Sequence, residues 1–141
     1  MRPKVSVCVL NYERRDLLRR TLESARAQRY PVEILAVDNA STDGSAEMVR
    51  DEFPDVHLVR LPRNVGAAAR NAGVAAARGD LVVTLDNDVR FDTAHEVEGA
   101  LEVFARYPRA AVVNFMIVDA TGALSHRDWC HPRDARRWAE H

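Results

Sequence analysis

Two carboxylates separated by one residue, Asp86 and Asp88, follow the apolar segment at residues 81–85. That segment is rich in aliphatic and β-branched residues, which is typical of a buried strand. A strand cannot bury two unpaired carboxylates cheaply, so they are either solvated at its end or paired with a cation. Because the chain turns where a strand ends, one carboxylate can bind a metal while the other binds a hydroxyl or a water. Mg²⁺ and Mn²⁺ prefer such oxygen ligands. Alternatively, the two acids are simply solvated residues of a turn.

Polar side chains follow two more apolar segments. Asn11 and Tyr12 come after residues 5–10, and Asp38 comes after residues 32–37. Asp38 can accept a hydrogen bond from a nucleobase or a ribose hydroxyl, and it is equally suited to capping a loop. Tyr12 can stack on a base or lie half-buried against a helix.

Arg70 interrupts an alanine-rich segment. It can point into solvent or reach a phosphate group. The glycine-rich motifs of dinucleotide oxidoreductases and P-loop enzymes are absent from the sequence, and so is the G-x-S-x-G nucleophile elbow of α/β-hydrolases. Their absence argues against these three classes of enzyme.

Strand and helix patterns alternate along the chain. Apolar segments predict strands over residues 5–10, 32–37, 56–61, 81–85 and 110–118. Apolar spacing predicts helices over residues 14–28, 45–53, 67–78 and 93–107, the third closed by a left-handed Gly79 and the last capped by Thr93. A turn signal at residues 119–122 predicts a hairpin with residues 123–125, followed by a polar tail. Since the strands lack polar faces, we expect an α/β fold with a parallel sheet covered by helices on both faces.

In such a sheet, ligands bind at the carboxyl ends of the strands. The polar residues that follow the strands are therefore expected to meet at one edge of the sheet. These residues are Asn11, Tyr12, Asp38, Asn39, Asp86, Asn87 and Asp88.

Composition narrows the classes of function. The 141 residues are enough for one domain with a substantial core. Lysine and arginine number 20 against 21 acidic residues, for a net charge of −1, so binding to nucleic acid or to anionic membranes is not expected. No apolar run approaches the ~20 residues of a membrane span, and no signal peptide is evident at the N-terminus. We expect a cytoplasmic protein and leave peripheral association with a membrane open.

Four segments taken together resemble the N-terminal nucleotide-sugar-binding half of GT-A-fold glycosyltransferases of family 2. They are VSVCVLNYER, EILAVDNASTDGS, NVGAAARNAGVAAARGD and LDND, and they span about residues 4–118 in this order. The resemblance implies a Rossmann-like three-layer α/β/α sandwich with a mainly parallel sheet, C-terminally incomplete. Residues 1–118 would be its core, and residues 119–141 would lead to a missing acceptor-binding part.

The resemblance also implies an activity. It points to a metal-dependent, inverting enzyme that transfers a sugar from a UDP-, dTDP- or GDP-linked donor to an acceptor hydroxyl of unknown identity. Asp86 and Asp88 would hold Mn²⁺ or Mg²⁺ at the donor diphosphate. The residues that would contact the donor are Asn11, Tyr12, Asp38, Asn39, Arg70, Asp86 and Asn87.

The sequence departs from the family pattern in three ways. Asn39 stands where many members carry a second acidic residue, which puts the base preference in doubt, and Glu13 stands where Asn is common. Inverting members take their catalytic base from a segment well beyond the D-x-D motif. We therefore expect the base beyond His141, and expect this chain to bind a nucleotide better than it transfers a sugar.

Two other functions are compatible with the same fold. One is a non-catalytic nucleotide-binding or assembly module. The other is a sugar-phosphate nucleotidyltransferase, which would need a glycine-rich phosphate loop after the first strand. Residues 10–14 contain no glycine, so this second alternative is disfavoured.

Overall fold

The computed structural model of the chain describes residues 4–119 and 121–123. The strands are β1 (Val5–Asn11), β2 (Val32–Asp38), β3 (His57–Arg60) and β4 (Leu81–Asp86). The helices are α1 (Arg15–Arg26), α2 (Ser45–Glu52), α3 (Arg70–Ala76) and α4 (Glu96–Arg106), with a 3-10 turn η1 (Gly66–Ala69) before α3. The first four predicted strands and all four predicted helices are therefore present, with small shifts at their ends.

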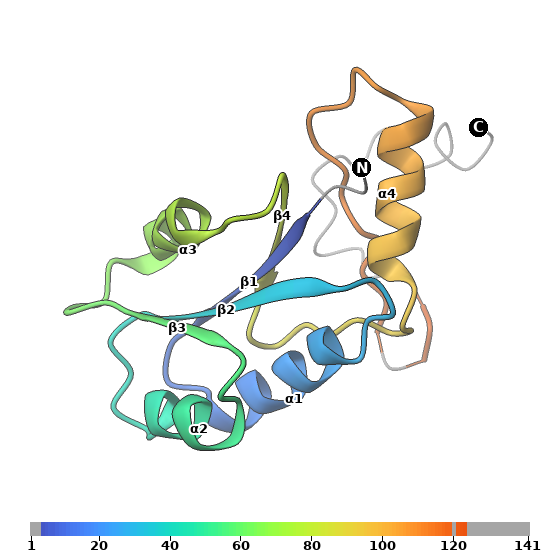
Figure 1. Cartoon of the computed structure of the whole chain (residues 1–141). Helices are drawn as coiled ribbons and strands as arrows, with labels where there is room; N and C mark the ends of the chain where they lie inside the picture. The colour runs from blue at the N-terminus through green and yellow to red at the C-terminus, as the bar shows by residue number, and fades with distance from the viewer. Residues whose placement is uncertain (1–3, 120, 124–141) are drawn as a thin grey trace. The chain divides into compact units, whose positions relative to one another are not determined.

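The four strands form one parallel sheet in the order β3-β2-β1-β4 (Figure 1). The register pairs Asn11 with Asp38, Asp38 with Arg60, and Leu10 with Asp86. This confirms the predicted parallel sheet. It also brings the carboxyl ends of all four strands to one edge.

Helices cover both faces of this sheet, as predicted. Helices α1 and α2 lie on one face and α3 on the other (Figure 1). The buried face of α1 carries Leu18, Leu22 and Ala25 at the spacing of an amphipathic helix. Helix α3 approaches the sheet closely at Gly73, where an added Cβ would lie 2.7 Å from Cγ2 of Val37.

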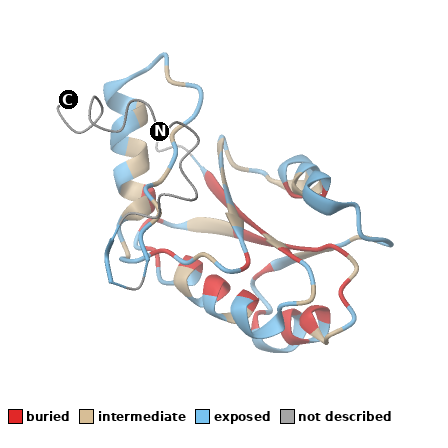
Figure 2. Cartoon of the chain, turned by 180° about the vertical axis from the view of Figure 1, so that it is seen from behind, coloured by how far each residue is buried: buried red, intermediate tan, exposed pale blue. Residues whose placement is uncertain are grey.

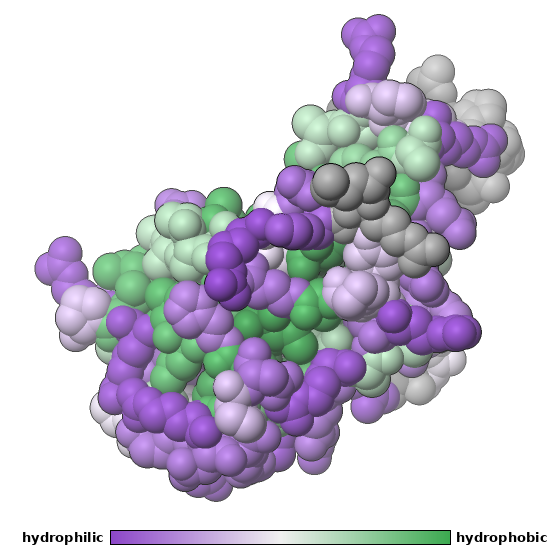
Figure 3. All heavy atoms as spheres, viewed as in Figure 1, coloured by the Kyte–Doolittle hydropathy of each residue, from purple (hydrophilic) through white to green (hydrophobic). Residues whose placement is uncertain are grey.

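The core lies between β1, β2 and the inner faces of α1 and α2 (Figure 2). Hydrophilic residues cover α1 and α2 on the face shown in Figure 3, while apolar residues are visible over the sheet. Cys8 belongs to the core on the α3 side. Its burial, and then the nearby charge of Glu33, raise the pKa of the thiol to about 11. Cys8 is therefore a packing residue and not a reactive one.

The prediction of a left-handed Gly79 at the end of the third helix was wrong. Helix α3 ends at Ala76, and the described glycines with positive φ are Gly44, Gly66 and Gly122. Gly79 is needed for another reason, because an added Cβ would lie 2.7 Å from the backbone nitrogen of Ser6. A side chain at this position would separate the chain entering β4 from β1.

The segment before the D-x-D motif is less buried than expected. Strand β4 forms the edge of the described sheet, and its side chains alternate between intermediate and exposed. Val82 and Thr84 are exposed, so the prediction of a fully buried strand was wrong for this element. An edge strand with one packed face explains the alternation.

The described residues up to Leu101 and those from Glu102 onward form two compact units. In the second unit, residues 110–117 form no strand and Val118 makes only an isolated bridge, so the predicted strand over residues 110–118 was wrong. Val112 is 74% exposed, so this apolar segment does not pack as a buried strand would.

The predicted turn at residues 119–122 is present. The Gly122 N–H donates to the carbonyl of Asp119 at 2.9 Å, and the Asp119 N–H donates to the carbonyl of Ala123 at the same distance. The last residues of the predicted hairpin and the tail to residue 141 lie outside the described residues. Within the described part of the chain, no helix has the length and apolar character needed to cross a membrane.

The fourth helix starts later than predicted, at Glu96. Thr93 precedes the helix, and its hydroxyl accepts a hydrogen bond of 3.2 Å from the N–H of His95. The Glu96 carboxylate in turn accepts from the N–H of Thr93. This reciprocal arrangement is that of a capping box, with the predicted cap residue Thr93 and Glu96 three residues later.

Candidate functional site

Each strand of the sheet ends in a polar residue. Strands β1 to β4 end at Asn11, Asp38, Arg60 and Asp86, respectively. The register places Asn11 beside Asp38 and Asp38 beside Arg60. The expected convergence of polar residues at the carboxyl edge is therefore present for the strand ends.

The D-x-D motif forms a turn at the end of β4. Asp86 is the last strand residue, and its carbonyl accepts a hydrogen bond of 3.3 Å from the N–H of Val89. Asn87, between the acids, points inward and is buried. The side chains of Asp86 and Asp88 are each 51% exposed, so both carboxylates are accessible to a ligand.

Both carboxylates pair with an arginine. Arg14 Nη1 lies 3.0 Å from Oδ2 of Asp88, and Arg70 Nη2 pairs with Oδ1 of Asp86. Arg14 directly precedes α1, whereas Arg70 is the first residue of α3. The two acids are thus held by cations from opposite faces of the sheet.

Asn11 and Asn87 form a buried side-chain pair. The Asn87 Nδ2 group donates a hydrogen bond of 2.7 Å to Oδ1 of Asn11. Asn11 Nδ2 in turn donates to Oγ of Ser41 at 3.2 Å, and the Ser41 N–H donates to Oδ1 of Asp38 at 3.3 Å. This chain of hydrogen bonds links the ends of β1, β2 and β4. Asn11 and Asn87 are therefore committed to protein contacts in this structure.

Thr21 on α1 contacts the backbone of the D-x-D turn. Its buried hydroxyl lies 3.0 Å from the carbonyl of Asn87 and 2.7 Å from that of Val89. A hydroxyl has one proton, so it donates to one of these carbonyls at a time. Both carbonyls flank Asp88, which makes Thr21 a positioning residue for that carboxylate.

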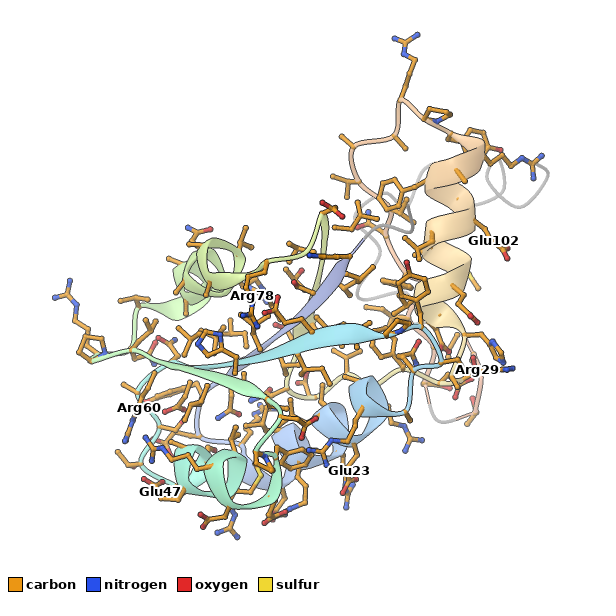
Figure 4. All side chains as sticks on the ribbon, in the orientation of Figure 1. Glu23, Arg29, Glu47, Arg60, Arg78 and Glu102 are labelled. Carbon is orange, nitrogen blue, oxygen red and sulfur yellow. The ribbon has the colours of Figure 1, made fainter. Side chains whose placement is uncertain are left out.

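Asp38 is buried, with 1% of its surface exposed. Among the described side chains, its Oδ2 is the buried oxygen without a hydrogen-bond partner. Arg60 Nε lies 3.5 Å away, which is within ion-pair range but makes no hydrogen bond. Arg60 is also 3.9 Å from Glu47 of α2, and Figure 4 shows these two side chains close together. Oδ2 of Asp38 therefore keeps acceptor capacity that no described group uses, although it is buried in this structure.

A shallow pocket adjoins Arg60. It is lined by residues of the loop after β2 and of the segment after β3: Ala40, Ser41, Thr42, Arg60, Leu61 and Pro62. The pocket lies beside the carboxyl ends of β2 and β3, which carry Asp38 and Arg60.

Asn39 makes different contacts from its neighbour Asp38. Its Oδ1 accepts from the Val65 N–H at 2.9 Å, and its Nδ2 donates to Oδ1 of Asn64 at 2.7 Å and to the carbonyl of Gly66 at 3.2 Å. Asn39 therefore ties the loop before η1 to the end of β2. An aspartate here could not make the two donations.

Two residues that are not glycine adopt positive φ angles beside the site. Glu13 has φ of 52° and Ala40 has φ of 65°. Each lies two residues beyond the end of a strand, β1 or β2. The carboxylate of Glu13 accepts from the N–H of Thr42 at 2.8 Å, which joins these two loops. Tyr12, between β1 and Glu13, is 46% exposed and available for stacking.

The carboxylates of Asp86 and Asp88 suit a hard divalent cation whose remaining ligands come from a bound phosphate group and from water. In the part of the chain that the structure describes, no cluster of three or more His, Cys, Asp or Glu residues could hold a metal. Asp86 and Asp88 can supply two carboxylates, which is the number of protein ligands that Mg²⁺ commonly uses together with substrate phosphates and waters. The residues present therefore fit a metal that binds with a phosphorylated ligand.

Several site residues did not stand out in the sequence. Arg14, Thr21, Ser41 and Arg60 contact the predicted residues but were not predicted. Arg60 could have been found, because it ends a strand just as Asp38 and Asp86 do. The other three depend on loop conformation and on helix packing, which no local pattern encodes.

The sequence matches the model of a known protein family, glycosyl transferase family 2, over residues 6–140. The chain is 42% identical over 90 residues to the succinoglycan biosynthesis protein ExoO of Rhizobium meliloti, which covers 61% of the chain and 26% of that protein. It is 36% identical over 130 residues to an uncharacterized glycosyltransferase of Nostoc sp., covering 89% of the chain and 37% of that protein. The chain thus spans well under half the length of these two relatives.

A solved structure supports the same assignment. The mannosyltransferase PcManGT of Pyrobaculum calidifontis, in complex with GDP-Man and Mn²⁺, matches with a TM-score of 0.69 and 32% identity. The match covers 74% of this chain and 33% of that protein. Sequence and fold agree with the GT-A architecture inferred from the resemblance, and the chain belongs to glycosyl transferase family 2.

Proposed function

We propose that this chain binds the nucleoside diphosphate of a sugar donor in a metal-dependent, inverting glycosyltransferase. The observation that carries the proposal is the turn at Asp86 and Asp88, which presents two accessible carboxylates at the edge of the sheet where Asp38 also ends a strand. Ligands of parallel α/β sheets bind at this edge. The complex of PcManGT with GDP-Man and Mn²⁺ supports a nucleotide-sugar donor and a divalent cation.

The residues divide into a phosphate side and a base side. On the phosphate side, Asp86 and Asp88 would hold Mn²⁺ or Mg²⁺ and Arg70 would approach the diphosphate. When bound, the metal would stabilise the negative charge that develops on the leaving nucleoside diphosphate. On the base side, Asp38 would accept a hydrogen bond from the base and Tyr12 would stack on it.

Asn11, Asn39 and Asn87 contribute to this proposal through positioning. Their side chains hold the turn at Asp88 and the loop before η1, as their hydrogen bonds to protein groups indicate. Direct contact of these three amides with a donor stays a prediction. The catalytic base expected beyond His141 and the cytoplasmic location are also predictions that no described residue tests.

Calorimetric titration of the chain with UDP, dTDP and GDP, each with Mn²⁺, tests the proposal. We expect at least one nucleotide to bind, and expect Asp88→Ala and Asp86→Ala to weaken binding at least tenfold, or by about 1.4 kcal/mol. Asp92→Ala is the matched control, because Asp92 is an exposed acid just beyond the motif. Failure of the folded chain to bind any of the three nucleotides would refute donor binding.

The base side needs a separate experiment. Asp38→Asn should weaken binding of the preferred nucleotide by about tenfold and leave Mn²⁺-pyrophosphate binding unchanged, because pyrophosphate has no base. Tyr12→Ala should weaken only the nucleotide, and Tyr12→Phe should retain affinity because the ring remains. Equal losses for nucleotide and pyrophosphate would contradict the assignment of Asp38 and Tyr12 to the base.

A further inference from the structure

Each acid of the D-x-D motif already has a cationic partner. The Arg14–Asp88 pair is 3.0 Å long, and Arg70 pairs with Asp86. The Arg14 and Arg70 side chains are 53% and 37% exposed, respectively. Pairs this exposed contribute little to stability and can exchange partners without opening the core.

The charges of these four groups balance. The two guanidinium groups neutralise the two carboxylates with which they pair. A divalent cation bound alone would leave an excess of positive charge beside two arginines. The diphosphate of a nucleotide sugar carries about two negative charges, so metal and diphosphate together restore neutrality. The charge balance therefore favours joint binding of the two over binding of the metal alone.

The backbone around Arg14 fixes where its side chain can reach. The N–H of Glu13, just before it, donates to Oγ of Ser41 at 3.0 Å. The N–H of Arg15, just after it, donates to Oδ2 of Asp43 at 2.8 Å. Arg14 is therefore anchored on both sides, and its guanidinium group reaches the carboxyl edge of the sheet from the start of α1.

We propose that Arg14 and Arg70 are internal counter-cations of Asp88 and Asp86, and that they transfer to the diphosphate when a metal–nucleotide complex binds. The proposal rests on the proposed function for the identity of the metal ligands. Without a donor, the two arginines suppress binding of the metal alone. Once the nucleotide sugar is bound, the planar guanidinium groups of both arginines can donate several N–H hydrogen bonds to the phosphate oxygens. This adds Arg14 to the diphosphate-binding residues.

The first experiment measures Mn²⁺ alone, by calorimetry or by the electron paramagnetic resonance signal of free Mn²⁺. We expect Arg14→Gln and Arg70→Gln each to tighten Mn²⁺ binding by about threefold to tenfold, as removal of one positive charge near a divalent cation predicts. Arg14→Lys should restore the weak binding of the unsubstituted chain. Arg50→Gln is the matched control, because Arg50 is an exposed arginine of α2 whose nearest acid is Glu47 at 3.5 Å.

The second experiment adds the diphosphate. In the presence of Mn²⁺, Arg14→Gln should weaken binding of pyrophosphate and of the preferred nucleotide by about tenfold, whereas Arg50→Gln should not. A single substitution would thus change the two affinities in opposite directions. A purely structural role for Arg14 would lower both.

The outcomes separate this proposal from the proposed function. If Mn²⁺ binding is unchanged or weaker in Arg14→Gln and Arg70→Gln, the counter-cation role is overturned, whether or not nucleotides bind. If Mn²⁺ binding tightens but neither pyrophosphate nor any nucleotide binds to the unsubstituted chain, the transfer step and the proposed function both fail. Opposite changes in the two affinities support the full proposal.

Discussion

The side-chain amide of Asn87 donates a hydrogen bond of 2.7 Å to Oδ1 of Asn11, and both residues are buried. Asn87 is the middle residue of the D-x-D motif, so this bond fixes the inward side of the turn while the two acids face outward. The identity of the middle residue therefore matters to the fold as well as to the proposed site. A buried acceptor left without its donor costs more than the bond itself contributes.

Asn87→Ala should lower the free energy of unfolding by about 1–3 kcal/mol, because Oδ1 of Asn11 would remain buried without a partner. The Asn11→Ala, Asn87→Ala double variant should lose less than the sum of the single losses, with a coupling energy on the order of 1 kcal/mol. Urea unfolding of the four proteins measures this. Strict additivity would show that the two amides act independently.

Substitutions of Thr21 test whether its hydroxyl positions Asp88. Thr21→Val keeps the shape of the side chain but removes the donor to the carbonyls of Asn87 and Val89. We expect faster amide hydrogen exchange at Val89, after correction for global stability, because the turn loses its support. Thr21→Ser keeps the hydroxyl and should leave this exchange near that of the unsubstituted chain. The same acceleration in both variants would assign the effect to packing and not to the hydroxyl.

Ala40 provides a prediction of increased stability. Its φ of 65° is unfavourable for a residue with a Cβ, and glycine adopts such an angle without that cost. Ala40→Gly should raise the free energy of unfolding by about 0.5–1 kcal/mol. Ala75→Gly, on an exposed position of α3, is the matched control and should lower it by about the same amount. Chemical denaturation that shows a loss in both variants would mean that the strain at Ala40 is negligible.

The parallel sheet could be predicted because its signals are local. Apolar segments of strand length alternate with amphipathic helices, and only a covered parallel sheet accommodates that order. Where the local signal was ambiguous, the prediction failed. Residues 110–118 have the composition of a strand, but strand formation depends on a partner that composition does not specify.

The site was predictable to the level of the strand ends. Asp38 and Asp86 could be placed together because the carboxyl ends of parallel strands share an edge. The contacts that link the strand ends could not be predicted, because they are made by residues of two loops. In these loops Glu13 and Ala40 adopt positive φ angles, and no glycine signals the turn. Arg14 reaches Asp88 through that loop geometry, across 74 positions of sequence.

Glu33 should make stability depend on pH in the acid range. Burial alone would raise its pKa, but hydrogen bonds from Ser6 Oγ at 2.6 Å and from the backbone and side chain of Arg78 lower the pKa to about 2, from an ordinary value of 4.5. Figure 4 shows Arg78 on the α3 side of the sheet. A carboxylate whose pKa is lower in the folded state stabilises the fold at pH values above its unfolded pKa. That contribution is lost as the pH falls from about 4.5 toward 2.

Glu33→Gln removes this titration. Above pH 5 the variant should be less stable than the unsubstituted chain by about 2 kcal/mol, a figure reduced from the full pKa shift because Arg78 is largely exposed. The difference should shrink as the pH falls, because protonated Glu33 then also carries no charge. Urea unfolding at several pH values between 5 and 2.5 measures the difference. Glu23→Gln, at an exposed position of α1 (Figure 4), is the control, and its difference in stability from the unsubstituted chain should not shrink with pH. If the difference for Glu33→Gln stays constant as the pH falls, the substitution acts through packing.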